Sequence, residues 1–416
     1  MKSVLVLLVT GFMVFGAGLF SQVMAQEAHP ALIELGVQFS SLRFSDVHSG
    51  GLLTAEFSTT NAFGGRFTFN LSRHFALEAE GNFFPHQTSV GLAMGRVLQG
   101  QAGVKAGQRF KHFGLFGKAR PGIISISDVF EFTVPRFEKH RGQFFSFDVG
   151  GVIEFYPSHR VLTRIDVGDT VIWGLPGGTF TFPTGPRPAT HNLQVSAGIG
   201  FRLLNPEKSE NENKAVAPKP HRLTAGAQFA SLNVSIHDRF FGGLSAPFDI
   251  RDILTSIGFG GRLTYDVNDH VALEGEGNFF PDSSQTSNRG RSGGRILQGQ
   301  FGVKVGKRFQ RFGLFGKARP GVVSFGRTVK IDRVDTSQAF PIVTLREQRS
   351  SYFSTDLGGV LEFYPSRRIV TRFDAGDTLI RYGATRVPIS FTTTIENVPP
   401  ATQHNFQFSA GVGFRF

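Results

Sequence analysis

Two acidic and two basic residues lie at short fixed spacings and could do chemistry together. Glu78 and Glu80 are two residues apart, as are Lys118 and Arg120 within the segment GLFGKARPG, which returns unchanged at 313–321. Paired carboxylates can perform general acid–base catalysis when the pKa of one of them is raised. Nearby cations keep carboxylates ionised instead. This mixture of charges therefore favours structural ion pairing over catalysis.

The segments that carry these residues alternate between apolar and polar side chains with a period of two, as β-strands do. In 65–71 the large apolar residues occupy odd positions while Arg66 and its polar neighbours occupy even ones, and 75–83 follows the same rule. The pattern predicts an all-β protein. In the first half of the chain the expected strands are 31–42, 62–71, 75–84, 96–110, 113–125, 142–156, 160–172 and 191–203.

Strand length and loop length favour a membrane barrel over a soluble sandwich. The expected strands are about ten residues or longer, which suits a tilted membrane span. Short and long connections alternate, as in bacterial outer-membrane barrels with short periplasmic turns and long outer loops. The short connections are 72–74, 111–112 and 157–159, and the long ones are about 43–61, 85–95, 126–141 and 173–190.

The charged face of these strands should line a narrow lumen. An eight-stranded barrel has an interior just wide enough for side chains to fill, so inward charges must pair with one another. The first set of expected lumen charges is Arg66, Glu78, Glu80, Lys105, Arg109, Lys118, Arg120, Asp148, Glu154, Arg164 and Asp166. The second set is Arg262, Glu274, Glu276, Lys304, Arg308, Lys317, Arg319, Asp356, Glu362, Arg372 and Asp374.

The second half of the chain repeats the first, which indicates a tandem duplication. DVGGVIEFYPSHRVLTRIDVGDT becomes DLGGVLEFYPSRRIVTRFDAGDT, and HNLQVSAGIGFR becomes HNFQFSAGVGFR. We expect one barrel repeat at 26–204, a second at 222–416, and a polar periplasmic linker at 205–221 between them. Two eight-stranded transmembrane antiparallel up-and-down β-barrels are favoured, because each copy keeps a full charge set. A single sixteen-stranded barrel is the alternative.

The N-terminus predicts export. Residues 1–25 combine Lys2, an apolar run and a small residue at Ala25, as secretory signal peptides do. The chain has no Cys and a formal net charge of +12. Lack of cysteine excludes disulfides, thiolate nucleophiles and cysteine-ligated metals. Export argues against nucleic acid as the partner of this basic chain.

No motif predicts a cofactor or a metal. Four histidines, His74, His112, His159 and His191, lack the spacing of metal ligands. The two Gly-x-Gly segments have no following helix to complete a dinucleotide site. No Ser–His–acid triad is apparent, so an outer-membrane lipid hydrolase is only a third hypothesis. We expect no catalytic, cofactor-binding or metal-binding residues.

Each repeat resembles the eight-stranded outer-membrane barrel family, which includes the OmpA-type transmembrane domain, OmpX and the opacity proteins. The signal peptide, the alternating strands and the ending HNFQFSAGVGFRF carry this resemblance. It implies that Phe416 is an assembly signal for the barrel-assembly machinery and that the barrels contact outer-membrane lipids and lipopolysaccharide. The chain lacks the peptidoglycan-binding domain of full-length OmpA.

The expected function depends on whether the chain forms two barrels or one. Two plugged barrels predict a non-enzymatic integral protein of the bacterial outer membrane, with a structural role in envelope integrity or a role in adhesion through its outer loops. A sixteen-stranded barrel would instead be a general diffusion porin. The basic segment SNRGRSGGR at 287–295 is a candidate contact for lipopolysaccharide phosphates or an unknown external ligand.

Overall fold

A computed structural model describes most of the chain. The expected signal peptide (1–25) and linker (205–221) lie outside the described residues. The described ranges are 31–45, 57–90, 93–133, 136–175, 189–203, 222–240, 248–287, 290–335, 342–388 and 395–416.

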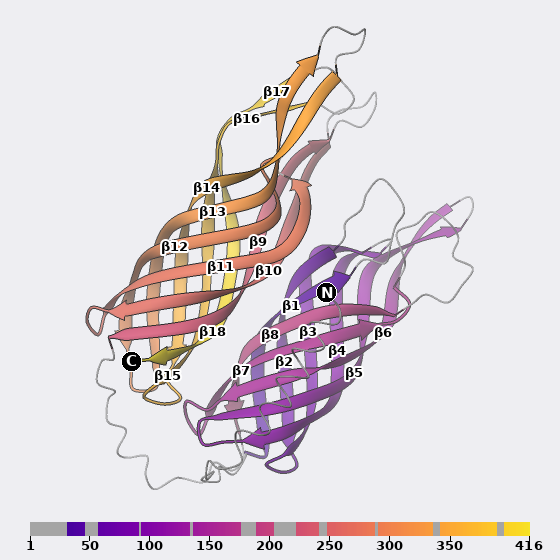
Figure 1. Cartoon of the computed structure of the whole chain (residues 1–416). Coiled ribbons are helices and arrows are strands. Elements are labelled where there is room, and N and C mark those ends of the chain that lie inside the picture. Colours follow the sequence, from indigo (N-terminus) through magenta and orange to yellow (C-terminus); the bar gives the residue numbers. More distant parts are fainter. Residues whose placement is uncertain are drawn as a thin grey trace, which may run out of the picture.

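The first repeat forms a closed eight-stranded barrel (Figure 1). Each strand pairs antiparallel with its neighbours in the chain, and β8 returns to pair with β1. Its strands are β1 (Ile33–Ser45), β2 (Phe57–Asn70), β3 (Phe75–Val90), β4 (Ala93–Arg109), β5 (Phe113–Thr133), β6 (Arg136–Phe155), β7 (Val161–Ile172) and β8 (Thr190–Arg202).

The second repeat forms another closed barrel of eight strands, in which β18 pairs with β9. A separate two-stranded hairpin, β16 (Thr385–Pro388) and β17 (Ile395–Val398), is inserted before β18. The barrel strands are β9 (Leu223–Phe240), β10 (Phe248–Asp266), β11 (Val271–Ser287), β12 (Ser292–Arg308), β13 (Phe312–Asp335), β14 (Ile342–Phe363), β15 (Ile369–Tyr382) and β18 (Ala401–Arg415).

The predicted fold of two eight-stranded barrels is confirmed. The alternative of one sixteen-stranded barrel is wrong, because β1 and β8 close the first sheet on itself before the second begins. Among the described residues no helix is long and apolar enough to cross a membrane.

The strands reach further than the sequence pattern suggested. The expected loops 85–95 and 126–141 are largely strand, because β3 continues to Val90 and β5 continues to Thr133. The expected loop 43–61 loses residues at both ends to β1 and β2 in the same way. Backbone pairing needs no apolar face, so the hairpins continue past the part of the wall that faces lipid.

The two faces of the wall are inverted relative to a soluble protein. Large apolar side chains point outward, and Val37, Phe63, Phe259 and Phe301 are each more than half exposed. The charged side chains that the sequence assigned to the lumen point inward. An apolar outer surface over a polar interior is the arrangement of a transmembrane outer-membrane barrel.

Candidate functional site

The lumen of each barrel brings together the charges that the sequence placed on the polar face. Every one of these side chains is buried except that of Arg308, which is partly buried. Because neighbouring strands run antiparallel with inward residues in register, side chains far apart in sequence meet across the lumen. The pairing of these groups determines whether the lumen can conduct or react.

Glu78 is the centre of the first lumen. Its carboxylate lies 3.2 Å from Nζ of Lys105 and 3.8 Å from Nη1 of Arg120, and it also accepts two hydrogen bonds from Arg164. Lys105 in turn contacts Glu154 at 2.5 Å. A carboxylate that faces three cations stays ionised, so this cluster is built for ion pairing and not for proton transfer.

The repeated segment GLFGKARPG supplies two cations for one carboxylate. Lys118 Nζ lies 2.8 Å from Asp148 Oδ2, and Arg120 donates to the same oxygen at 2.6 Å. A second nitrogen of Arg120 lies 2.5 Å from Glu80. The spacing of two residues therefore places both bases over the next strand, where Asp148 compensates their charge.

The second lumen repeats this arrangement. Lys317 and Arg319 lie 2.7 and 2.5 Å from Asp356. Glu274 occupies the place of Glu78 and contacts Lys304 at 3.6 Å. The other ion pairs also correspond between the barrels. Arg66 with Asp166 corresponds to Arg262 with Asp374, and Lys105 with Glu154 corresponds to Lys304 with Glu362. Arg164 with Glu78 corresponds to Arg372 with Glu274.

Glycine makes room for the large bases. A Cβ atom at Gly103 would lie 2.1 Å from the carbonyl oxygen of Ala119, and one at Gly302 would lie 2.1 Å from that of Ala318. Real Cβ atoms do not approach so closely, so these positions admit only glycine without a shift of the backbone. The backbones of β4 and β5 therefore lie close together at Arg120, as do those of β12 and β13 at Arg319.

An amide layer and then an apolar layer close the lumen above the charges. Gln38 donates to Asn82 at 2.8 Å, and Asn82 donates to Gln99 at 2.9 Å. Beyond them Leu42 and Phe84 belong to a fully buried apolar cluster. The prediction of a charged lumen missed this apolar layer, although Leu42 and Phe84 continue the inward parity of their strands. The second barrel has a similar cluster around Phe280, Ile296 and Phe325.

Sequence reasoning missed one acid at the opposite end of each lumen. Glu34 lies 3.3 Å from Arg202 in the first barrel, and Asp266 lies 2.8 Å from Arg308, a predicted lumen charge, in the second. Both acids follow the same inward parity as the predicted set. They went unnoticed because they lie at the ends of the strands, where the alternating pattern is short.

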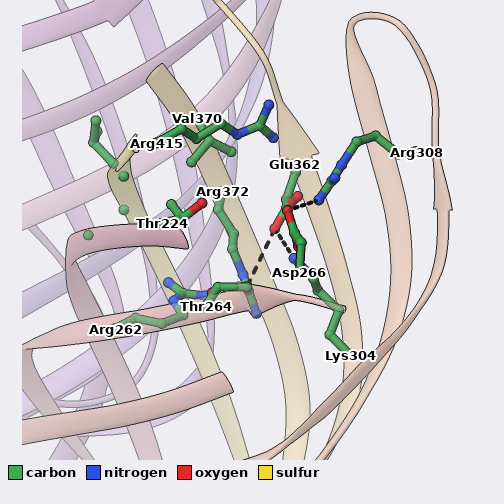
Figure 2. Close-up of a pocket in the computed structure, with 14 residues that line it drawn as sticks. Thr224, Arg262, Thr264, Asp266, Lys304, Arg308, Glu362, Val370, Arg372 and Arg415 are labelled. Atoms are coloured by element: carbon green, nitrogen blue, oxygen red, sulfur yellow. Dashed lines mark hydrogen bonds and ion pairs between the residues drawn. The ribbon is translucent and has the colours of Figure 1, made fainter. Parts of the chain in front are cut away.

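A small cavity lies at this end of the second lumen (Figure 2). Its volume is about 20 Å³, enough for about one water molecule. Thr224, Asp266, Arg308 and Arg415 are among its lining residues. Figure 2 shows labelled bases and acids side by side around this space, with dashed lines that mark contacts among them.

A histidine and an aspartate meet on the outer wall of each barrel. His191 Nδ1 lies 2.6 Å from Asp169 Oδ2, and on the neighbouring strand Ser45 Oγ donates to the backbone carbonyl of His191 at 2.7 Å. His404 and Asp377 repeat the contact at 2.5 Å. Nucleophilic catalysis requires the hydroxyl to bond to the imidazole. Here the hydroxyl bonds to the backbone, so the contact ties β1, β7 and β8 together.

The histidines that the sequence singled out do not converge. His74 Nδ1 contacts the carbonyl oxygen of Gly107 at 3.0 Å, and His191 pairs with Asp169. Within the described part of the chain, no group of three or more His, Cys, Asp or Glu side chains is placed to hold a metal ion.

Comparison with known proteins gives a likeness in fold. No family model matches the chain, and no curated protein matches it. Ail, the attachment invasion locus protein of Yersinia pestis, is similar at 11% identity and a TM-score of 0.28 over 42% of this chain and 99% of that chain. The N-terminal β-barrel domain of Pseudomonas aeruginosa OprF is similar at 9% identity and a TM-score of 0.24 over 42% and 98%.

A larger barrel is also similar over most of the chain. A Pseudomonas aeruginosa FadL homologue has 11% identity and a TM-score of 0.29 over 92% of this chain and 90% of that chain. All of these are outer-membrane barrels. Likeness at this level concerns architecture alone.

Proposed function

We propose that the protein is a non-enzymatic outer-membrane protein whose barrels are closed to solutes and which acts through its outer surface. The observation that carries this is the filled lumen. Charged, amide and apolar layers follow one another along the first barrel, and Arg120, Asp148 and Glu154 are each fully buried. A porin needs a continuous water path, which a barrel of this size lacks once side chains fill it.

Conductance of the purified full chain in a planar bilayer tests the closed lumen. We expect no long-lived openings of nanosiemens size. Such openings, at a frequency proportional to the amount of inserted protein, would contradict the proposal. The matched control is a variant with the central plug removed, Glu78→Ala with Arg120→Ala and Arg164→Ala, which should raise conductance if it still inserts.

The outer part of the second barrel carries the surface that favours adhesion. Strands β13 and β14 form a long exposed ribbon in which Lys330 lies directly opposite Arg346. Like charges opposite one another destabilise a sheet unless an anion lies between them. The exposed bases at this end are Arg295, Arg327, Lys330, Arg333, Arg346, Arg349, Arg381 and Arg386, and the exposed acids among the described residues are Asp332 and Glu347.

This excess of positive charge suits an anionic polysaccharide that bears phosphate or sulfate groups. Guanidinium groups bind such oxyanions with paired hydrogen bonds. The described outer end of the first barrel has only Arg96 and Arg141 as clearly exposed Arg or Lys side chains, with Asp128 partly exposed. The opposed bases of β13 and β14 favour the second barrel as the ligand surface.

Binding of the full chain to dextran sulfate and to purified lipopolysaccharide tests this surface. Lys330→Glu with Arg346→Glu should weaken binding at least about tenfold, because each charge lost from the contact lowers affinity and its salt dependence. The matched control is Arg96→Glu with Arg141→Glu, the same charge change on the first barrel. Equal losses from both pairs would show attraction by net charge alone, and no loss from the first pair would refute the assignment.

A further inference from the structure

A row of outward-facing side chains on the first barrel is buried although it belongs to the wall that should face lipid. Ser41 and Thr163 are 0% and 1% exposed, whereas Val37 and Phe63, which also point outward from β1 and β2, are each 62% exposed. Bare hydroxyl groups are unfavourable in hydrocarbon, where water cannot bond to them. Something other than lipid must cover this row.

The second barrel covers it and bonds to it. Asn61 donates from Nδ2 to Oδ1 of Asn233 at 2.7 Å, and Ser231 donates to Oδ1 of Asn61 at 2.9 Å. Nearer the periplasmic end, the hydroxyl of Thr163 donates to that of Thr371 at 3.0 Å. The polar groups of the two outer walls therefore satisfy one another.

Apolar contacts surround these hydrogen bonds. Phe39 stacks on Phe408 with ring centroids 4.1 Å apart. Val195 and Ala197 on the first barrel and Ala410 on the second are buried although they point outward. Small residues here allow the two walls to approach closely, as they do where helices pack within membranes.

The contact runs along the full height of the barrels. From the outer end to the periplasmic end it passes from β2 (Asn61) through β1 and β8 to β7 (Thr163). A vertical line on a barrel crosses successive strands in this way because the strands are tilted. The row is therefore one continuous seam.

The seam also joins the barrels at matching depth. Thr163 lies in VLTRIDVGDT and Thr371 in IVTRFDAGDT, so the two hydroxyl groups that meet occupy the same position in each repeat. Phe39 and its counterpart Phe229 both pack against the ring of Phe408, so these two equivalent positions lie at the same depth. Both barrels then span one bilayer in parallel, side by side (Figure 1).

We propose that the two barrels dock through this seam within the outer membrane and act as one fused pseudo-dimer. The partner of the polar row on the first barrel is the second barrel of the same chain. The linker between them makes the association intramolecular, so a modest interface suffices to hold it. Docking also brings the basic ribbon of the second barrel and the outer end of the first onto one surface.

Disulfide trapping in the full chain tests the seam without interference, because the natural chain has no Cys. In a protein with Thr163→Cys, Thr371→Cys and a protease site within 205–221, mild oxidation in native outer membranes should link the two halves. The halves then stay joined after cleavage until a reductant is added. Disulfide geometry needs Cα atoms within about 7 Å, which the adjoining hydroxyl groups indicate.

The matched control is Val149→Cys with Leu357→Cys, an equivalent pair of positions that are 47% and 44% exposed on the lipid-facing wall. The seam pair should link at least about tenfold more than this control, because docking raises its effective concentration. Equal yields, or disulfides that join separate chains only, would overturn the proposal.

A bulky substitution on the seam separates docking from folding. Ser41→Trp should lower the yield of the Thr163→Cys and Thr371→Cys link at least about fivefold, since tryptophan is tolerated near lipid but blocks close approach of the walls. Heat-modifiable gel mobility should stay normal in this variant, which shows that both barrels still form. An unchanged yield with normally folded barrels would refute the seam.

Discussion

The two lumens share their central charges but differ at the end where the short turns lie, which is expected to face the periplasm. Glu34 of the first barrel corresponds to Thr224 of the second, and Asn70 corresponds to Asp266. One acid has thus moved from the first strand of the repeat to the second. Each barrel therefore has the same number of acids at this end, and the charge of the interior stays compensated. What differs is the position of the acid that pairs with an arginine.

The different position of the acid changes which arginine has an acidic partner. In the first barrel Arg202 lies 3.3 Å from Glu34, while Arg109 donates to the neutral Asn70 at 2.6 Å. In the second barrel Arg308 pairs with Asp266. The cation–π contact is shared, because Arg415 lies 4.1 Å from the ring of Tyr364 and Arg202 lies 4.2 Å from that of Tyr156. The cavity beside Thr224 is the space that the longer side chain of a glutamate would fill.

Loss of the central carboxylate should have the largest effect on the free energy of unfolding. The effect should be equal in the two barrels. Glu78→Gln and Glu274→Gln each leave buried cations without their acid, which costs about 3–5 kcal/mol. Unfolding in urea from lipid vesicles, followed by gel mobility, measures this. The control is Leu77→Val on the lipid-facing side of the same strand, which should change little. A large effect in one barrel alone would show that the central layers are not equivalent.

A charge on the lipid-facing wall should come next in size and should again be equal in both barrels. Val149→Arg and Leu357→Arg place a guanidinium on exposed positions of the apolar band, which costs about 2–4 kcal/mol near the middle of the bilayer. Refolding yield into vesicles is the measurement, with Val149→Leu as the control. Tolerance of arginine at either position would invert the assignment of that wall to lipid.

The periplasmic end should distinguish the barrels, with opposite signs. Glu34→Thr removes the acid of Arg202 and should destabilise the first barrel by about 1–3 kcal/mol. Thr224→Glu fills the cavity, faces Arg415 and should stabilise the second barrel. Adding Asn70→Asp to Glu34→Thr reproduces the second barrel's arrangement and should recover most of the loss. If the double variant did not recover stability, the position of the acid, and not the number of acids, would determine stability at this end of the lumen.

The smallest effect on stability is expected at the chain end. Phe416 is 64% exposed, and its counterpart at the end of β8 is Leu203. Phe416→Gly should leave barrel stability within about 0.5 kcal/mol, yet reduce the amount of folded protein in the outer-membrane fraction. Leu203→Gly, the equivalent change inside the chain, should not reduce it. Equal yields for both variants would contradict an assembly signal at Phe416.

The sequence predicted the strands, their faces and the duplication because these depend on local pattern. A period of two assigns a face to each residue without knowledge of its neighbours in space. The parity of GLFGKARPG alone places Lys118 and Arg120 on one side. The same local argument explains the errors, since residues that point inward at the outer end, such as Leu42 and Phe84, are apolar and were not expected in a charged lumen.

Tertiary structure alone decided which groups pair and how the sheet closes. Glu78 meets Lys105, Arg120 and Arg164 on three other strands, and no spacing in the sequence specifies that choice. β8 pairs with β1 and not with β9. This pairing uses backbone hydrogen bonds, which every residue can form, so the side-chain pattern does not specify it. The pattern of strands therefore permits one barrel or two, and the filling of each narrow lumen by its own charges favours two.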